Sequence, residues 1–205
     1  MLETTIFKLD GYETPKKLIQ DFGKLVQKEG SQAVLKQNRF KPDCEKWVAG
    51  MTCIGMTKLT KRSWFVKPGD PKEQTPDFRA AAFDKIENEK YLIWDEVECE
   101  IVRCPMGLIP VDHKEPECIF FEHIEKTKLW KVYPENFVLV IYSQFTWKQF
   151  SLEKLSKFFC DRAPKLREIW VLMNISLYGD RHLLAKLYPN RLDVEIDNSD
   201  LLYER

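Results

Sequence analysis

The chain has 205 residues, and its 32 basic and 32 acidic side chains give it a formal net charge of zero. Hydrophobic residues make up 44% of it and aromatic residues 13%, which is enough for a core and excludes a wholly disordered chain. The zero net charge also argues against a protein that only coats nucleic acid.

The chain shows no sign of export or membrane insertion. Its first residues lack a basic segment followed by a long apolar run, so we expect no secretory signal. No stretch approaches the roughly 18 apolar residues that span a bilayer. We therefore expect a cytoplasmic protein, folded as a single domain over residues 1–205, with its six cysteines free.

The first predicted elements are two helices. Thr14 followed by Pro15 is typical of a helix start, and apolar residues then recur at helical spacing. Glu29 and Gly30 end this helix. A second, shorter helix is predicted over residues 31–37.

Two strands with a basic turn between them are predicted next. The strands are Trp47–Leu59 and Ser63–Val66, and the turn carries Lys58, Lys61 and Arg62. These three cations are candidates to contact a phosphate backbone. A solvated hairpin turn is the simpler interpretation of the same residues.

A β-hairpin is predicted in the middle of the chain, from strands Asp77–Phe83 and Tyr91–Arg103. Because side chains alternate along a strand, Glu96, Glu98 and Glu100 share one face of the second strand. Either Asp77 or Arg79 of the first strand can lie near that acidic face.

The last third is predicted to alternate strands and helices, after a segment at 115–131 that suits either. The predicted strands are Phe137–Tyr142, Glu168–Met173 and Arg191–Ile196, and the predicted helices are Ser151–Phe159 and His182–Leu187. This order implies crossover connections and a partly parallel sheet. The expected fold is α/β, with a mixed central sheet of antiparallel hairpins and strand–helix–strand units flanked by helices.

Three carboxylates on one strand face repel one another, so their presence needs a reason. Solvent is one, since an exposed antiparallel face is normally polar. A divalent cation is the other, because Mg²⁺ takes hard oxygen ligands, commonly one or two carboxylates with water and substrate phosphate.

Pro76-Asp77, followed on the next strand by Glu98-Cys99-Glu100, resembles the signature of the PD-(D/E)XK nuclease superfamily. The order of predicted elements over about residues 14–160 is similar to the restriction-endonuclease-like fold: a helix, three antiparallel strands, a helix and a strand. The resemblance implies that Asp77 and Glu98 bind Mg²⁺ or Mn²⁺. Glu100 takes the place usually held by lysine and would orient or deprotonate the attacking water.

The resemblance also implies a function and partners. It implies a hydrolase that cuts phosphodiester bonds, most simply a DNA endonuclease, with Lys58, Lys61 and Arg62 on the nucleic-acid backbone. A further metal ligand from the first helix would be Asp21 or Glu29. A homodimer would allow both strands of a duplex to be cut.

Two alternatives remain open. The chain could be a non-catalytic protein-interaction module, or a nuclease-like fold without activity, for which the missing lysine is an indication. A zinc site could be formed by Cys99, Cys104, Cys118 and His123, although zinc sites usually have closer ligand spacing.

Overall fold

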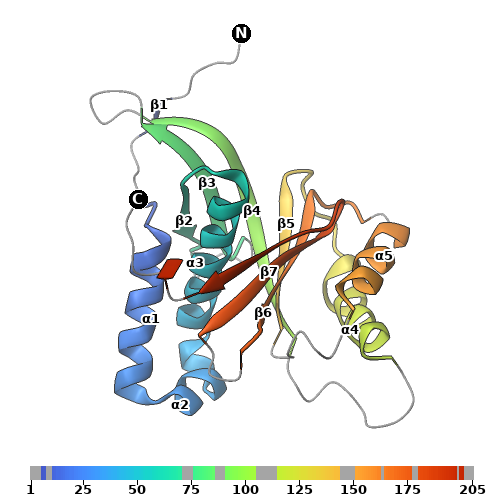
Figure 1. Cartoon of the computed structure of the whole chain (residues 1–205), viewed down its shortest axis with the longest axis horizontal. Helices are drawn as coiled ribbons and strands as arrows, with labels where there is room; N and C mark the ends of the chain where they lie inside the picture. The colour runs from blue at the N-terminus through green and yellow to red at the C-terminus, as the bar shows by residue number, and fades with distance from the viewer. Residues whose placement is uncertain are drawn as a thin grey trace. The chain divides into compact units, whose positions relative to one another are not determined.

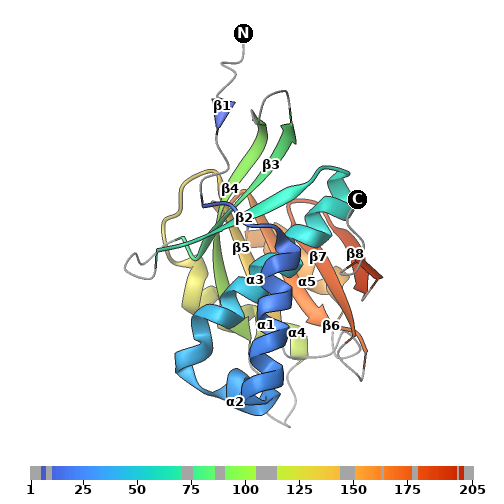
Figure 2. The same ribbon diagram turned by 90° about the vertical axis from the view of Figure 1, so that its left-hand side faces the viewer.

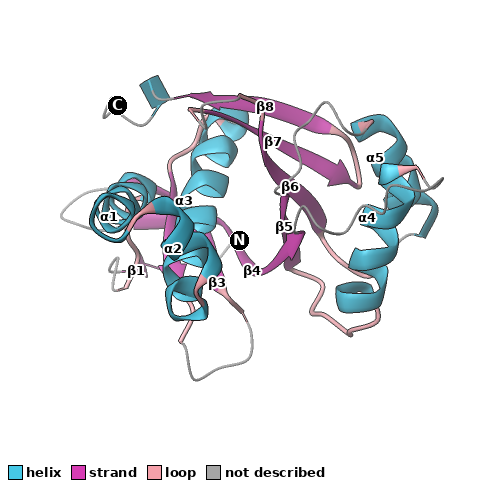
Figure 3. Ribbon diagram, turned by 90° about the horizontal axis from the view of Figure 1, so that it is seen from below, coloured by secondary structure: helices cyan, strands magenta, loops and turns pink. Residues whose placement is uncertain are grey.

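The computed structural model describes residues 6–7, 11–70, 76–85, 91–104, 115–143, 151–162, 164–176, 180–197 and 199–200. They belong to two compact units, Met1–Cys99 and Glu100–Arg205. Each unit contains both helices and strands, which Figure 3 distinguishes by colour, so the predicted mixed α/β class is confirmed.

The first unit begins with helices α1 (Pro15–Glu29), α2 (Ser31–Lys36) and α3 (Lys41–Thr60), with a 3₁₀ turn at Asn38–Phe40 before α3. The Thr14 side chain accepts a hydrogen bond from the Lys17 backbone N–H, and this cap confirms the predicted start of α1. Helices α1 and α3 lie side by side in Figures 1 and 2.

The prediction of a strand at Trp47–Leu59 is wrong, because these residues belong to α3. All residues from Val48 to Met56 are buried, so the helix shows no polar stripe from which a helical period could be recognised. Its threonines also suit a buried helix, since the Thr52 hydroxyl donates to the Val48 carbonyl oxygen at 2.8 Å. Lys58 therefore lies on a helix, and Lys61 ends it at a left-handed φ of 59°.

The strands of the first unit are β1 (Ile6–Phe7), β2 (Trp64–Pro68), β3 (Phe78–Lys85) and β4 (Tyr91–Cys104). Strands β2, β3 and β4 pair antiparallel in that order, and β1 pairs with β4. The predicted hairpin is thus confirmed. From Glu100 onward, β4 belongs to the second unit.

The described residues of the second unit continue with helices and strands. They are α4 (Pro116–Ile124), followed by a π-helical turn η3 (Glu125–Leu129), then β5 (Phe137–Ser143), α5 (Leu152–Arg162), β6 (Glu168–Asn174), β7 (Arg181–Tyr188) and β8 (Leu192–Asp197). The ambiguous segment is therefore helical. Helices α4 and α5 cover the same side of strands β5, β6 and β7 (Figure 3).

The prediction of a helix at His182–Leu187 is wrong, because these residues form strand β7. Strand β7 pairs antiparallel with β6 and with β8, whereas β5 and β6 pair parallel. Leu183, Leu184 and Ala185 are all buried, so β7 lacks the alternation that identifies a half-buried strand.

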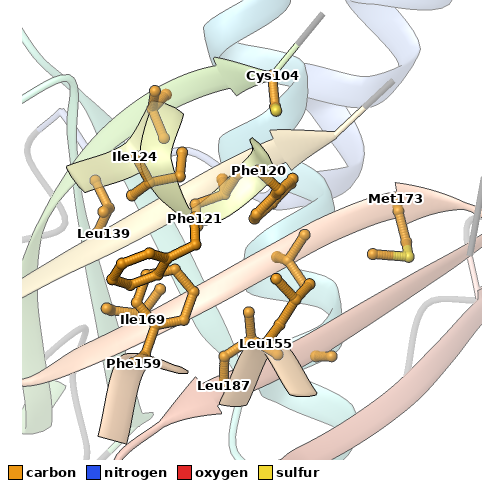
Figure 4. Close-up of a cluster of buried hydrophobic side chains, with 14 of the residues drawn as sticks. Cys104, Phe120, Phe121, Ile124, Leu139, Leu155, Phe159, Ile169, Met173 and Leu187 are labelled. Carbon is orange, nitrogen blue, oxygen red and sulfur yellow. The ribbon is translucent and has the colours of Figure 1, made fainter. Parts of the chain in front are cut away.

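A continuous apolar core fills the second unit (Figure 4). Phe120, Phe121 and Ile124 come from α4, and Leu155 and Phe159 come from α5. They pack on the inward residues of strands β5, β6 and β7. No helix in the described part of the chain is long and apolar enough to cross a membrane.

Candidate functional site

Asp77 directly precedes strand β3 of the first unit, and Glu98 lies on β4, which pairs with β3. Phe78 pairs with Cys99, and the Asp77 N–H donates to the Cys99 carbonyl oxygen at 2.9 Å. Asp77 is two residues from Arg79, which pairs with Glu98, so alternation directs Asp77 to the face that carries Glu98. The two carboxylates are diagonal neighbours, a relation that separates α-carbons by roughly 7–8 Å.

Gly69 fixes the backbone that carries Asp77. The Gly69 N–H donates to the Asp77 carbonyl oxygen at 2.8 Å. A β-carbon added to Gly69 would lie 2.2 Å from the Pro76 carbonyl oxygen, which is an impossible contact. Only glycine therefore allows the end of β2 to approach Pro76 and Asp77 this closely.

Arg79 is the direct partner of Glu98. Its Nε and Nη2 atoms donate to the Glu98 Oε1 atom at 3.0 and 2.9 Å. Arg79 thus lies near the acidic face, as its position in the hairpin predicts. The side chains are 41% and 32% exposed, so this ion pair is open to water and is worth about 1 kcal/mol or less.

Glu96 takes part in the same polar strip. Its Oε1 atom accepts a hydrogen bond of 2.6 Å from the Tyr12 hydroxyl, and the Lys67 ammonium lies 5.8 Å from the centre of the Tyr12 ring. Burial and the bond to Glu96 raise the pKa of Tyr12, so its hydroxyl keeps its proton and donates it. The predicted acidic face is therefore partly neutralised by cations and a hydroxyl.

Glu100 has a different environment in the second unit, where it is only 3% exposed. Its Oε1 atom accepts hydrogen bonds from Lys128 at 2.5 Å and Lys131 at 2.8 Å, and its Oε2 atom accepts one from the Tyr133 hydroxyl at 2.5 Å. Burial raises the pKa of Glu100, but these three donors together lower it below the ordinary value. A carboxylate held in this way is a weak base. It holds the ammonium groups of Lys128 and Lys131 in place.

The two candidates for a further acid both lie on α1 and both have cationic partners. Asp21 pairs with Lys24 at 3.3 Å, and Glu29 pairs with Arg39 at 3.2 Å. Within the described ranges, no group of three or more His, Cys, Asp or Glu side chains is arranged to hold a metal ion. The choice between Asp21 and Glu29 therefore stays open.

The donor chemistry of Asp77 and Glu98 fits Mg²⁺ or Mn²⁺, since both supply carboxylate oxygens. Arg79 is a competitor, because its guanidinium already bonds to one oxygen of Glu98. Because the Arg79–Glu98 ion pair is partly exposed, displacing Arg79 costs about 1 kcal/mol or less. Asp77 and Glu98 thus provide the type of ligand that the ion prefers. Arg79 competes with the ion for the Glu98 carboxylate.

The cations predicted to contact nucleic acid lie at the C-terminal end of α3. Lys58 is on the last turn, Lys61 is exposed, and Arg62 follows directly. The guanidinium carbon of Arg62 lies 3.6 Å from the centre of the Trp94 ring. Two of the three predicted residues therefore adjoin each other at an exposed helix end.

Two of the four candidate zinc ligands lie in the interior. Cys99 and Cys104 are fully buried, and burial raises the pKa of Cys104 to about 12. All six cysteines are free, as predicted. Burial lowers the pKa of His182 to about 4, so this side chain is neutral at pH 7.

Sequence reasoning missed Tyr12, Lys128, Lys131 and Tyr133, which bind the acidic residues. The two lysines follow Glu100 by 28 and 31 positions, and a single sequence carries no signal that joins residues at that separation. The contact between Arg79 and Glu98 could be predicted from the sequence, because hairpin pairing places the two residues opposite each other.

Comparisons of the chain with protein-family models, curated protein sequences and solved structures found no match. Any function assigned to the chain therefore depends on its own residues.

Proposed function

We propose that the protein is a metal-dependent nuclease that hydrolyses phosphodiester bonds, with DNA as the first substrate to test. One observation supports this proposal: the Asp77 N–H donates to the carbonyl oxygen of Cys99, the neighbour of Glu98 on β4, so that strand alternation would direct both carboxylates to one face. The same two residues occupy the acidic positions of the nuclease-like motif. The order α3, β2, β3, β4, α4, β5 also follows the helix, three strands, helix and strand of the resembling fold.

Asp77 and Glu98 would hold Mg²⁺ or Mn²⁺ through carboxylate oxygens. A bound divalent ion would supply Lewis acidity toward the phosphate and a lowered pKa for a bound water. The chain itself contributes the backbone bonds that fix Asp77 and the guanidinium of Arg79, a charged donor that suits a phosphate oxygen.

The Glu100 cluster, defined as Glu100, Lys128, Lys131 and Tyr133, carries one surplus positive charge when both lysines are protonated. Lys128 and Lys131 remain 17% and 33% exposed, so their ammonium groups are within reach of solvent. Three donors thus engage Glu100 within its own unit, which argues against the role of general base expected from the motif.

The direct test is cleavage of labelled single-stranded and duplex DNA, and of the matching RNA, by the purified full chain in Mg²⁺ or Mn²⁺. Asp77→Ala and Glu98→Ala should each lower the rate at least about 100-fold, since each removes a metal ligand. Asp193→Ala, which changes an exposed carboxylate on β8, should cleave like the parent. If the double variant cuts as fast as the parent, these residues are not the site.

The second candidate is a non-catalytic binding module with a nuclease-like order of elements. The Arg79–Glu98 ion pair favours it, because a guanidinium already neutralises the carboxylate that a metal would need. Calorimetric titration with Mn²⁺ separates the candidates. Binding that Asp77→Asn removes favours the enzyme, whereas no heat of binding at millimolar Mn²⁺ favours the module.

A further inference from the structure

Trp94 occupies an irregular position on strand β4. Ala82 pairs with Asp95 and Phe83 pairs with Ile93, so Trp94 is the extra residue of a β-bulge. A bulge changes the direction of a side chain and is frequent beside binding sites. Trp94 is 51% exposed, whereas Trp64 in the same unit is 3% exposed.

Two contacts hold the Trp94 indole in place. The Arg62 guanidinium stacks over the ring at 3.6 Å, and the indole Nε1–H donates to an oxygen of Asp84. Arg62 covers one ring face, while half of the side chain stays accessible. The indole is therefore anchored by two contacts while about half of the residue is exposed, at 51%.

Two cationic side chains, Lys61 and Arg62, lie together beside this ring, while the carboxylate of Asp84 binds the edge of the indole. Lys61 is exposed at the end of α3, directly before Arg62. The Nη1 atom of Arg62 is buried and has no hydrogen-bond acceptor among the described residues. Aromatic faces flanked by cationic side chains are the usual means of binding unpaired nucleotides, whose bases stack while their phosphates meet the cations.

We infer that Trp94 and Arg62 form a stacking platform for an unpaired base of single-stranded nucleic acid, with Lys61 placed to meet its phosphates. The bases of a duplex stack on one another, so only unpaired bases or ends offer a free face to Trp94. This inference rests on the proposed function, because it specifies which form of nucleic acid the protein engages.

The test is fluorescence anisotropy of a labelled 20-nucleotide single strand, as DNA and as RNA, against the corresponding duplex. EDTA is present throughout, so that metal-dependent cleavage cannot occur. The parent should bind the single strand more tightly than the duplex. Trp94→Ala should weaken single-strand binding by about 5- to 150-fold, the range measured for loss of one base stack.

Matched variants distinguish stacking from a general loss of structure. Trp94→Phe keeps an aromatic face and should retain most of the affinity. Trp130→Ala removes a tryptophan that is 70% exposed in the second unit and should leave binding unchanged. Circular dichroism and thermal unfolding would establish that each variant is folded.

The outcomes for the platform and for the nuclease are separable. Trp94-dependent binding without cleavage in Mg²⁺ or Mn²⁺ supports the platform and contradicts the nuclease. Equal binding by Trp94→Ala and the parent, absence of single-strand binding, or equal affinity for the duplex overturns the platform whatever the cleavage assay gives.

Discussion

Glu98 and Glu100 show how identical side chains on one strand acquire different roles. Glu98 is partly exposed and shares one oxygen with Arg79, so its ion pair exchanges readily with solvent and ions. Glu100 is buried, and three donors occupy both of its oxygens. Glu98 is thus suited to binding a cation from solution, whereas Glu100 is suited to fixing the lysines around it.

Removing Arg79 should make Glu98 a better metal ligand. Arg79→Ala deletes a positive charge beside the carboxylate, and we expect the Mn²⁺ affinity to rise by about 5-fold, or roughly 1 kcal/mol. Calorimetric titration of this variant and the parent measures the change. A lower affinity for Mn²⁺ in Arg79→Ala would mean that Arg79 organises the site instead of competing for it.

Removing the charge of Glu100 should lower stability more than removing that of Glu98. Glu100→Gln leaves Lys128 and Lys131 without their counter-charge, and we expect the free energy of unfolding in urea to fall by about 2 kcal/mol at pH 7. Glu98→Gln is the matched control, with a loss of about 1 kcal/mol or less because its ion pair is exposed.

The effect of Glu100→Gln should also depend on pH. The pKa of Glu100 is lowered in the folded protein, so its stabilisation is complete above the unfolded pKa of about 4.3. It is lost as the pH falls through the folded pKa. The stability difference between parent and variant should therefore shrink from pH 7 to pH 3, and an unchanged difference would contradict this assignment.

At the scale of elements, helices α1 and α3 show when a sequence pattern is enough to predict a helix and when it is not. Helix α1 was predictable because its polar and apolar residues alternate with the helical period and Thr14 caps it. Helix α3 was not, because burial on every side removes that period. Strand β7 was mistaken for a helix for the same reason, since the consecutive residues Leu183, Leu184 and Ala185 are all buried and leave no alternation.

Two glycines test the close packing of α1 on α3. A β-carbon on Gly50 would lie 3.0 Å from the Pro15 carbonyl oxygen, whereas one on Gly23 would meet nothing within 4 Å. Gly50→Ala should lower the free energy of unfolding by roughly 1 kcal/mol, because crowding exceeds the gain in helix propensity. Gly23→Ala should raise it by about 0.5–1 kcal/mol. A Gly50→Ala variant as stable as Gly23→Ala would contradict this packing.

At the scale of the whole chain, the class of fold and the central hairpin followed from the sequence. The hairpin could be predicted because the alternation of polar and apolar residues and the turn residues between them define its two strands and their pairing. The partners of the acidic residues could not be predicted from the sequence, since Tyr12 precedes Glu96 by 84 positions and Lys131 follows Glu100 by 31. The nuclease motif supplied the positions of Asp77 and Glu98, and their chemistry remains a prediction.

The most direct measurement of the proposed function is a crystal structure of the full chain with Mn²⁺, with anomalous diffraction locating the ion. The proposal predicts a Mn²⁺ peak bonded to one oxygen each of Asp77 and Glu98, at roughly 2.1–2.2 Å, with Arg79 moved from Glu98 Oε1. Asp77→Asn, grown and soaked in the same way, should lose that peak. A parent structure in millimolar Mn²⁺ without an anomalous peak at these carboxylates, and with Arg79 still bonded to Glu98, would contradict it.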